Sequence, residues 1–280
     1  MNTKLISAFL ALALASMACG FELPKAPAPE PEVTENMSVP APDSDQVNLK
    51  LAFGAGELTL APGSSQLVDG TATYNYSAFK PVIKTDGSNV QVGMSEVNFN
   101  VFPSFKDLKN IWDLKLGTTP MDLSIEAGAY EGVFELGGLA LNNLSIKDGA
   151  ADVELSFSQP NLAEMSIFEY GTGASNVKMS GLANANFSLM DFSSGAGDYT
   201  LDFSGELQRD ASITISSGLS NMIIVVPEGV NAIVTVDSGA SNVNAGSGWE
   251  QNGKIYKQAG EGPMLTFVIN IGAGNVTLTK

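Results

Sequence analysis

Apolar and polar residues alternate in short runs along most of the chain from residue 47 onward. Examples are VNLKLAF (47–53) and ATYNYSAF (72–79), and turns rich in glycine, proline and aspartate separate the runs. A period of two places every second side chain on one face, as in a β-strand with one buried side. Residues 47–118 are therefore predicted to form a small antiparallel β region, with one short helix-compatible stretch at Phe105–Asp113.

A glycine recurs at a nearly constant spacing through residues 119–280. The spacings between consecutive glycines are 21, 24, 22, 23, 21 and 33 residues. A regular period of this size is typical of a solenoid, in which each coil of chain stacks on the next. The prediction is an all-β fold, a single-sheeted or β-helix-like solenoid of about seven rungs that follows the antiparallel region. The glycines are Gly128, Gly149, Gly173, Gly195, Gly218, Gly239 and Gly272.

Each of these glycines separates two short alternating phrases. Met190 and Phe192 precede Gly195, for example, and Tyr199 and Leu201 follow it. Two strands per coil, each with its apolar face inward, bury a continuous apolar column when the coils stack. The glycine is expected to supply a positive φ at a tight corner, and the Asp or Asn three residues later to hydrogen-bond the local backbone.

The last repeat is longer, and the excess lies in a hairpin insert at residues 246–262. Asn252-Gly253 is a strong signal for a two-residue hairpin turn. The hairpin is predicted to cap the C-terminal strand NVTLTK, which would otherwise be an exposed edge. Trp249 and Tyr256 flank the turn, where they form either an aromatic platform for sugar rings or a cross-strand pair that packs on the solenoid.

The N-terminus has the features of an export signal. Residues 1–18 combine a positive start, an uncharged apolar run and small residues at the end, as a signal peptide does. Cys19 follows directly, as in a bacterial lipobox, and is the predicted lipidation site; an ordinary secretory cut before a free Cys19 is the alternative. Residues 19–46 are rich in Pro, Ala and Glu, which predicts an extended tether between the lipid and the folded body.

Charge and residue types narrow the chemistry. The net charge is −16 and there is no histidine, so nucleic acid is not an expected partner, and histidine-based catalysis and zinc binding are excluded. No cofactor motif is present. Asp152, Asn176 and Asp198 would lie on neighbouring rungs, where they form either a calcium site or a hydrogen-bonded ladder. Arg209 and Asp210 are expected to be a solvated pair at a corner.

Several phrases resemble the bacterial toast-rack domain. They include AFGAGELTL near the start, TPMDLSIEAGAYEGVFELGGLALNNLSI in the middle and SGAGDYTLDFSGELQRDASITISSG later, in this order. This domain is related to adhesin-like solenoid families and to LiaF-like cell-wall-active antibiotic response proteins. The resemblance covers residues 47–280 and implies an all-β envelope protein. It implies no catalytic or binding residues.

The leading hypothesis is a non-enzymatic envelope lipoprotein. It would be membrane-anchored, on the outer side of the cytoplasmic membrane or on the cell surface, with its solenoid as a surface for adhesion, interaction or envelope-stress sensing. Its partners would be the membrane, through the lipid, and an envelope protein or glycan. The alternatives are a β-helix enzyme that acts on polysaccharides with carboxylates, and a structural subunit that stacks on itself.

Overall fold

The computed structural model describes residues 28–94 and 107–280. These residues form sixteen β-strands and two short 3-10 turns, at Ser77–Phe79 and Leu182–Ala185. No α-helix occurs within them, and none of their segments is a helix long and apolar enough to cross a membrane. The predicted all-β fold is confirmed.

The strands differ greatly in length. The short ones are β1 (Val33–Val39), β3 (Val68–Tyr74), β4 (Pro81–Asp86), β5 (Asn89–Met94), β6 (Asn110–Leu116), β8 (Leu141–Asp148), β9 (Ala150–Ser156), β14 (Glu250–Asn252) and β15 (Ile255–Gln258). The long ones are β2 (Val47–Pro62), β7 (Met121–Glu135), β10 (Met165–Ser180), β11 (Phe187–Asp202), β12 (Ala211–Val225), β13 (Val230–Ala245) and β16 (Glu261–Thr279).

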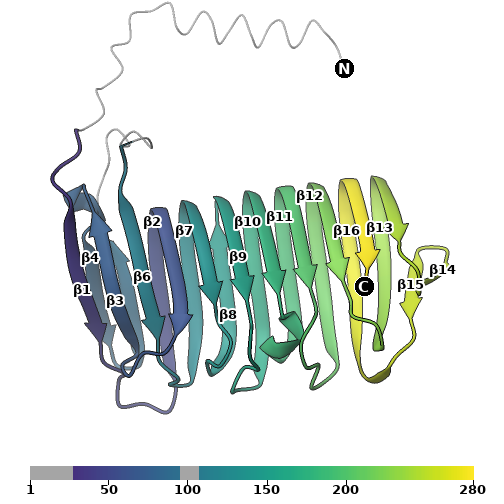
Figure 1. The fold of residues 1–280 in the computed structure, drawn as a ribbon, viewed down its shortest axis with the longest axis horizontal. Helices are drawn as coiled ribbons and strands as arrows, with labels where there is room; N and C mark the ends of the chain where they lie inside the picture. Colours follow the sequence, from purple (N-terminus) through teal and green to yellow (C-terminus); the bar gives the residue numbers. More distant parts are fainter. Residues whose placement is uncertain (1–27, 95–106) are drawn as a thin grey trace, which may run out of the picture.

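The long strands stack side by side along the long axis of the molecule (Figure 1). Each one turns a corner near its middle, so that its first half pairs in parallel with the first halves of its neighbours and its second half with their second halves. β8 and β9 together make one such coil. The predicted repeat is thus confirmed, and β2 adds a further coil that stacks on β7 in the same register.

The core lies between the two halves of the coils. Inward residues are almost completely buried on both sides of the corner, as the 0% exposure of Phe192 and the 1% exposure of Tyr199 show. These two rings, from opposite halves of β11, meet edge to face with centroids 5.1 Å apart. Burial of a large apolar side chain contributes about 1.5–3 kcal/mol, so this continuous column is the main source of stability.

The corner glycines stack directly on one another. A Cβ atom on Gly173 would lie 2.4 Å from the carbonyl oxygen of Gly149, and one on Gly195 would lie 2.5 Å from the oxygen of Gly173. None of the corner glycines has a positive φ; that conformation occurs two residues later, at Gly197 and Gly274. The expected reason for the glycines was therefore wrong: they permit close backbone contact between coils rather than an unusual φ.

The C-terminal strand is not at the end of the stack. β16 lies between β12 and β13, where Figure 1 shows it in yellow. The hairpin β14–β15 pairs with Ala232–Thr235 of β13 instead, so the prediction that it caps the strand NVTLTK was wrong. β16 carries the apolar phrase MLTFVINI, whereas the second half of β13 ends in SNVNA. The more apolar strand therefore takes the interior position, where both of its edges are paired.

The N-terminal end differs from the sequence prediction in two places. Residues 33–39 of the predicted tether form β1, which pairs with β3, and the described part of the helix-compatible stretch 105–113 leads into β6. Both differences have the same cause, because pairing with a neighbouring strand outweighs weak local preference. The region is also mixed: β5 and β6 pair in parallel with β2, while β4 and β3 are antiparallel to them.

Candidate functional site

A groove of about 510 Å³ lies on the outer face of the first halves of the strands, toward the N-terminal end of the stack. Residues of β2, β5, β7 and β8 form its floor, and the end of β4 contributes to one side. We call it the outer-face groove. Its polar residues are Asn48, Lys50, Lys84, Thr85, Asp86, Asn89, Gln91, Asp122, Ser124, Asn143 and Ser145.

Four polar side chains form one row across the floor of this groove. Asn89, Asn48, Asp122 and Asn143 are in register on four neighbouring strands. Asn48 Nδ2 donates to Asn89 Oδ1, and Asn143 Nδ2 donates to Asp122 Oδ1, both at 2.8 Å. These bonds fix the amide groups, while Asn89 Nδ2 and the Oδ1 atoms of Asn48 and Asn143 have no partner among the described residues.

The charges that line the outer-face groove balance. Lys50 and Lys84 are matched in number by Asp86 and Asp122, although the whole chain carries a net charge of −16. Lys50 Nζ also lies 2.6 Å from Glu126 Oε2, a half-exposed ion pair that holds the lysine across the strands. The charged side chains therefore give the groove no strong preference for a charged ligand.

A second groove, of about 710 Å³, runs along the corner of the stack. It is lined by hydroxyl groups from successive coils, and these bond to one another: Ser194 Oγ donates to Ser217 Oγ at 2.8 Å, and Ser217 Oγ to Ser220 Oγ at 2.9 Å. Ser194 and Ser217 thus bond within the protein, whereas the outer-face groove carries an in-register row of amide groups with unpaired atoms, and we take it as the candidate site.

Comparison with known proteins identifies the family. The family model of the N-terminal domain of toast_rack, DUF2154, matches residues 28–167, half of the chain. The chain belongs to the toast-rack family. The match includes β1 and all strands that form the outer-face groove, and the resemblance noted in the sequence is confirmed.

One solved structure shows the same fold at low sequence identity, and a second has a lower structural similarity. A putative cell adhesion protein from Clostridium sporogenes is 19% identical, with a TM-score of 0.51; the alignment covers 89% of the toast-rack chain and 99% of the other. A putative adhesin from Bacteroides fragilis is 12% identical, with a TM-score of 0.49 and coverage of 88% and 96%. No curated protein matches the chain.

The predicted calcium residues of the toast-rack chain lie side by side. Asn176 is in register with Asp152 on one neighbouring coil and with Asp198 on the other, and all three are exposed. Asn221 Nδ2 donates to Asp198 Oδ1 at 2.7 Å, and Asn275 Nδ2 donates to Asn221 Oδ1 at 2.7 Å. The described residues contain no cluster of three His, Cys, Asp or Glu. The predicted hydrogen-bonded ladder is present from Asp198 to Asn275 but does not include Asp152 or Asn176 among the described contacts, and calcium binding stays a prediction.

The two aromatic residues of the hairpin do not face each other. The strand register pairs Tyr256 with Gln251, whose Nε2 donates to the Tyr256 hydroxyl at 3.0 Å. Tyr256 is 5% exposed, and Trp249 is half-buried and packs against the core. Both rings pack on the solenoid, and sugar binding by them stays a prediction. Cys19, the predicted lipidation site, lies outside the described residues.

A cluster of hydroxyl groups around one carboxylate, near the corner, was not predicted from the sequence. The Asp148 carboxylate accepts hydrogen bonds from Tyr170 (2.8 Å), Tyr130 (3.3 Å) and Thr172. Burial, reinforced by the charge of Asp148, raises the pKa of both tyrosine hydroxyls well above its usual value. The phenols therefore stay neutral donors at physiological pH. The cluster ties three successive coils together, which is a structural role.

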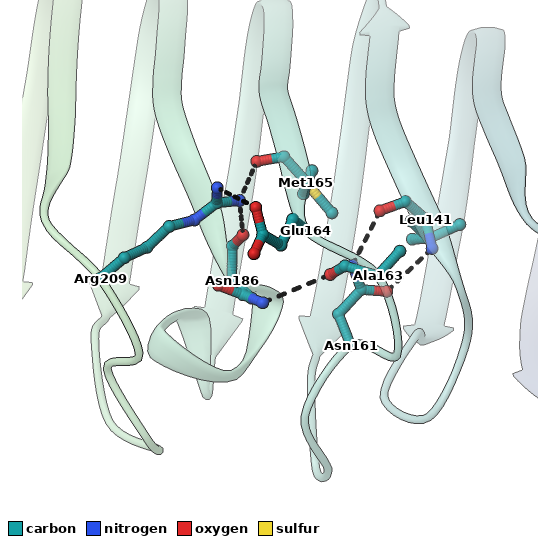
Figure 2. Close-up of polar contacts among 7 residues, drawn as sticks. All are labelled: Leu141, Asn161, Ala163, Glu164, Met165, Asn186 and Arg209. Atoms are coloured by element: carbon teal, nitrogen blue, oxygen red, sulfur yellow. Dashed lines mark hydrogen bonds and ion pairs between the residues drawn. The ribbon is translucent and has the colours of Figure 1, made fainter.

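Arg209 also has a structural role in the toast-rack body. Its guanidinium donates to the carbonyl oxygens of Met165 (2.6 Å) and Asn186 and lies 3.4 Å from Glu164 (Figure 2). Asp210 instead accepts from the backbone N–H of Met264 at 2.8 Å. The expectation of a solvated Arg209–Asp210 pair was wrong, because the guanidinium satisfies carbonyl groups at the ends of the coils.

Proposed function

We propose that this toast-rack chain is a non-enzymatic envelope lipoprotein of adhesin type, with the outer-face groove as its ligand-binding surface. The observation that carries the proposal is the in-register row from Asn89 to Asn143, which presents unpaired amide donors and acceptors on a rigid floor. Preorganised polar groups of this kind lose little conformational entropy when a ligand binds.

Two further observations support this role. The similar structure from Clostridium sporogenes is described as that of a putative cell adhesion protein, which agrees with an adhesin. The N-terminal sequence, with a signal-like segment before Cys19, agrees with export and anchorage on the outer side of the cytoplasmic membrane or on the cell surface. Residues before β1 would then hold the solenoid at a distance from the lipid surface.

Anchorage is tested by intact-mass analysis of the chain purified from membranes. A chain that begins at Cys19 and carries a mass increase of diacylglycerol size is expected, and the Cys19→Ala variant should lose both the increase and the membrane fraction. An unmodified chain found in the medium would contradict lipid anchorage and leave a freely secreted binder.

Binding is tested with envelope fragments and a variant that fills the groove. Ser124→Trp places a large ring on the groove floor, and we expect it to reduce retention of the protein on immobilised envelope fragments at least about tenfold, a loss of about 1.4 kcal/mol. Thr214→Trp is the matched control, because Thr214 is an exposed hydroxyl residue on the same outer face of β12. The Thr214→Trp variant should bind as the parent chain does. If Ser124→Trp binds as well as Thr214→Trp, the groove is not the binding surface.

A further inference from the structure

The polar and charged side chains that line the outer-face groove restrict its ligand to one chemical class. Its amide groups offer both donors and acceptors, and its charges cancel. A strongly anionic ligand would be repelled by a body of net charge −16 and would meet Asp122 on the floor. A strongly cationic ligand would meet Lys50 and Lys84. An apolar ligand would leave the row of amides unpaired, at a cost of about 1–3 kcal/mol for each group desolvated without a partner.

Neutral hydroxyl groups fit these positions because each can donate and accept at once. Asn89 Nδ2 requires an acceptor, whereas Asn48 Oδ1, Asn143 Oδ1 and the second carboxylate oxygen of Asp122 require donors. In the next row, the Gln91 side chain and the Ser124 hydroxyl have no hydrogen-bond partner among the described residues, so each is free to bond to a ligand in the groove.

The spacing of the row favours a chain of such groups over a single small molecule. Adjacent strands lie about 4.8 Å apart, so four strands place their polar side chains over about 14 Å. A linear ligand that crosses the strands can reach several of these side chains in succession. The volume of about 510 Å³ accommodates several sugar-sized units on the floor.

We infer that the outer-face groove binds a neutral oligosaccharide that lies across β5, β2, β7 and β8. The row Asn89, Asn48, Asp122 and Asn143 hydrogen-bonds its hydroxyl groups. The inference rests on the proposed function and adds the class of ligand and its orientation. Hydrogen bonds rather than ring stacking provide the contacts, because none of the described residues that line the groove is aromatic.

The test is calorimetric titration of the Cys19→Ala full chain with neutral linear oligosaccharides of four hexose or N-acetylhexosamine units. Saturable binding to at least one of them is expected. Asn89→Ala and Asp122→Ala should each weaken this binding at least about tenfold. Asn275→Ala is the matched control, because Asn275 and Asn221 form an equivalent pair, at 2.7 Å, outside the groove. It should bind like the parent chain.

Hydrogen exchange provides a readout that does not depend on the variants. The oligosaccharide should slow exchange in β2, β5 and β7 and leave β12 and β13 unchanged. The inference would be overturned if no neutral oligosaccharide binds or if the chain binds a polyuronate more tightly. It would also be overturned if Asn275→Ala weakens binding as much as the groove variants do.

Failure of this inference is distinguishable from failure of the proposed function. The neutral oligosaccharide that binds in the titration should, when added in excess, abolish binding of the parent chain to envelope fragments. Groove-dependent binding that survives this competitor would overturn the oligosaccharide and leave the adhesin role standing. Lack of any groove-dependent binding to fragments without competitor would remove both.

Discussion

Gly173→Ala is expected to lower the free energy of unfolding by at least about 3 kcal/mol, at the upper end of the cost of overpacking. The new Cβ would lie 2.4 Å from the carbonyl oxygen of Gly149, which accepts from the backbone N–H groups of Gly173 and Ala174 and so cannot move alone. The coils on both sides would have to separate or the corner would have to open. Chemical denaturation followed by far-UV circular dichroism measures this loss, which corresponds to a melting point lower by about 6–12 °C.

Gly171→Ala is the matched control for this substitution. Gly171 lies two residues earlier on β10, and a Cβ there would meet two side-chain atoms, the Ser193 Oγ at 3.3 Å and the Lys147 Cγ at 3.9 Å. A hydroxyl on a side chain can rotate away, so the cost should stay below about 1 kcal/mol. If both variants unfold at the same denaturant concentration, close contact between corner glycines does not limit the stability of the stack.

Asn161→Asp is expected to lower the free energy of unfolding by about 3–5 kcal/mol. Asn161 is 4% exposed and accepts from the Leu141 N–H at 2.9 Å, while its Nδ2 donates to the carbonyl oxygens of Leu141 and Ala163, both at 2.8 Å (Figure 2). The carboxylate of an aspartate keeps the first bond. It cannot donate to the two carbonyls and adds a buried negative charge beside them.

Asn161→Ala separates these contributions. It removes all three bonds without adding charge, so its expected cost is smaller, about 2–4 kcal/mol. Asn242→Ala serves as the control, because Asn242 is exposed and its single hydrogen bond to Asn275 is 3.5 Å long; its cost should stay within about 0.5 kcal/mol. Equilibrium unfolding curves of the three variants test the order, and an aspartate variant as stable as the parent chain would contradict it.

The repeat could be predicted because every coil carries the same local pattern of apolar residues and buries it in the same way. Alternating apolar positions around Gly195, for example, have one arrangement that buries them, which is two strands with their apolar faces inward. The hydrogen-bonded ladder through Asp198, Asn221 and Asn275 follows from the same register. These features depend on residues that are close in sequence or related by the repeat.

The outer-face groove could not be predicted from the same patterns. Asn48 and Asp122 are 74 positions apart in sequence, yet they are neighbours because β2 pairs with β7. The alternating pattern marks both as outward residues, but it does not say which strands are adjacent. The partners of Arg209 could not be predicted for a related reason, since its carbonyl acceptors are Met165 at the start of β10 and Asn186 just before β11, on other coils.

The sequence by itself determined the all-β class, the coil length and the inward face of each strand, because these follow from local periodicity and from the small size of the corner glycine. Only the tertiary structure decided the order of the last coils, the pairing of β1 and β6, and the position of the groove. The order of β12, β16 and β13 shows why. Neighbouring strands are chosen by the total apolar area buried and the number of paired edges, and both quantities belong to the whole stack.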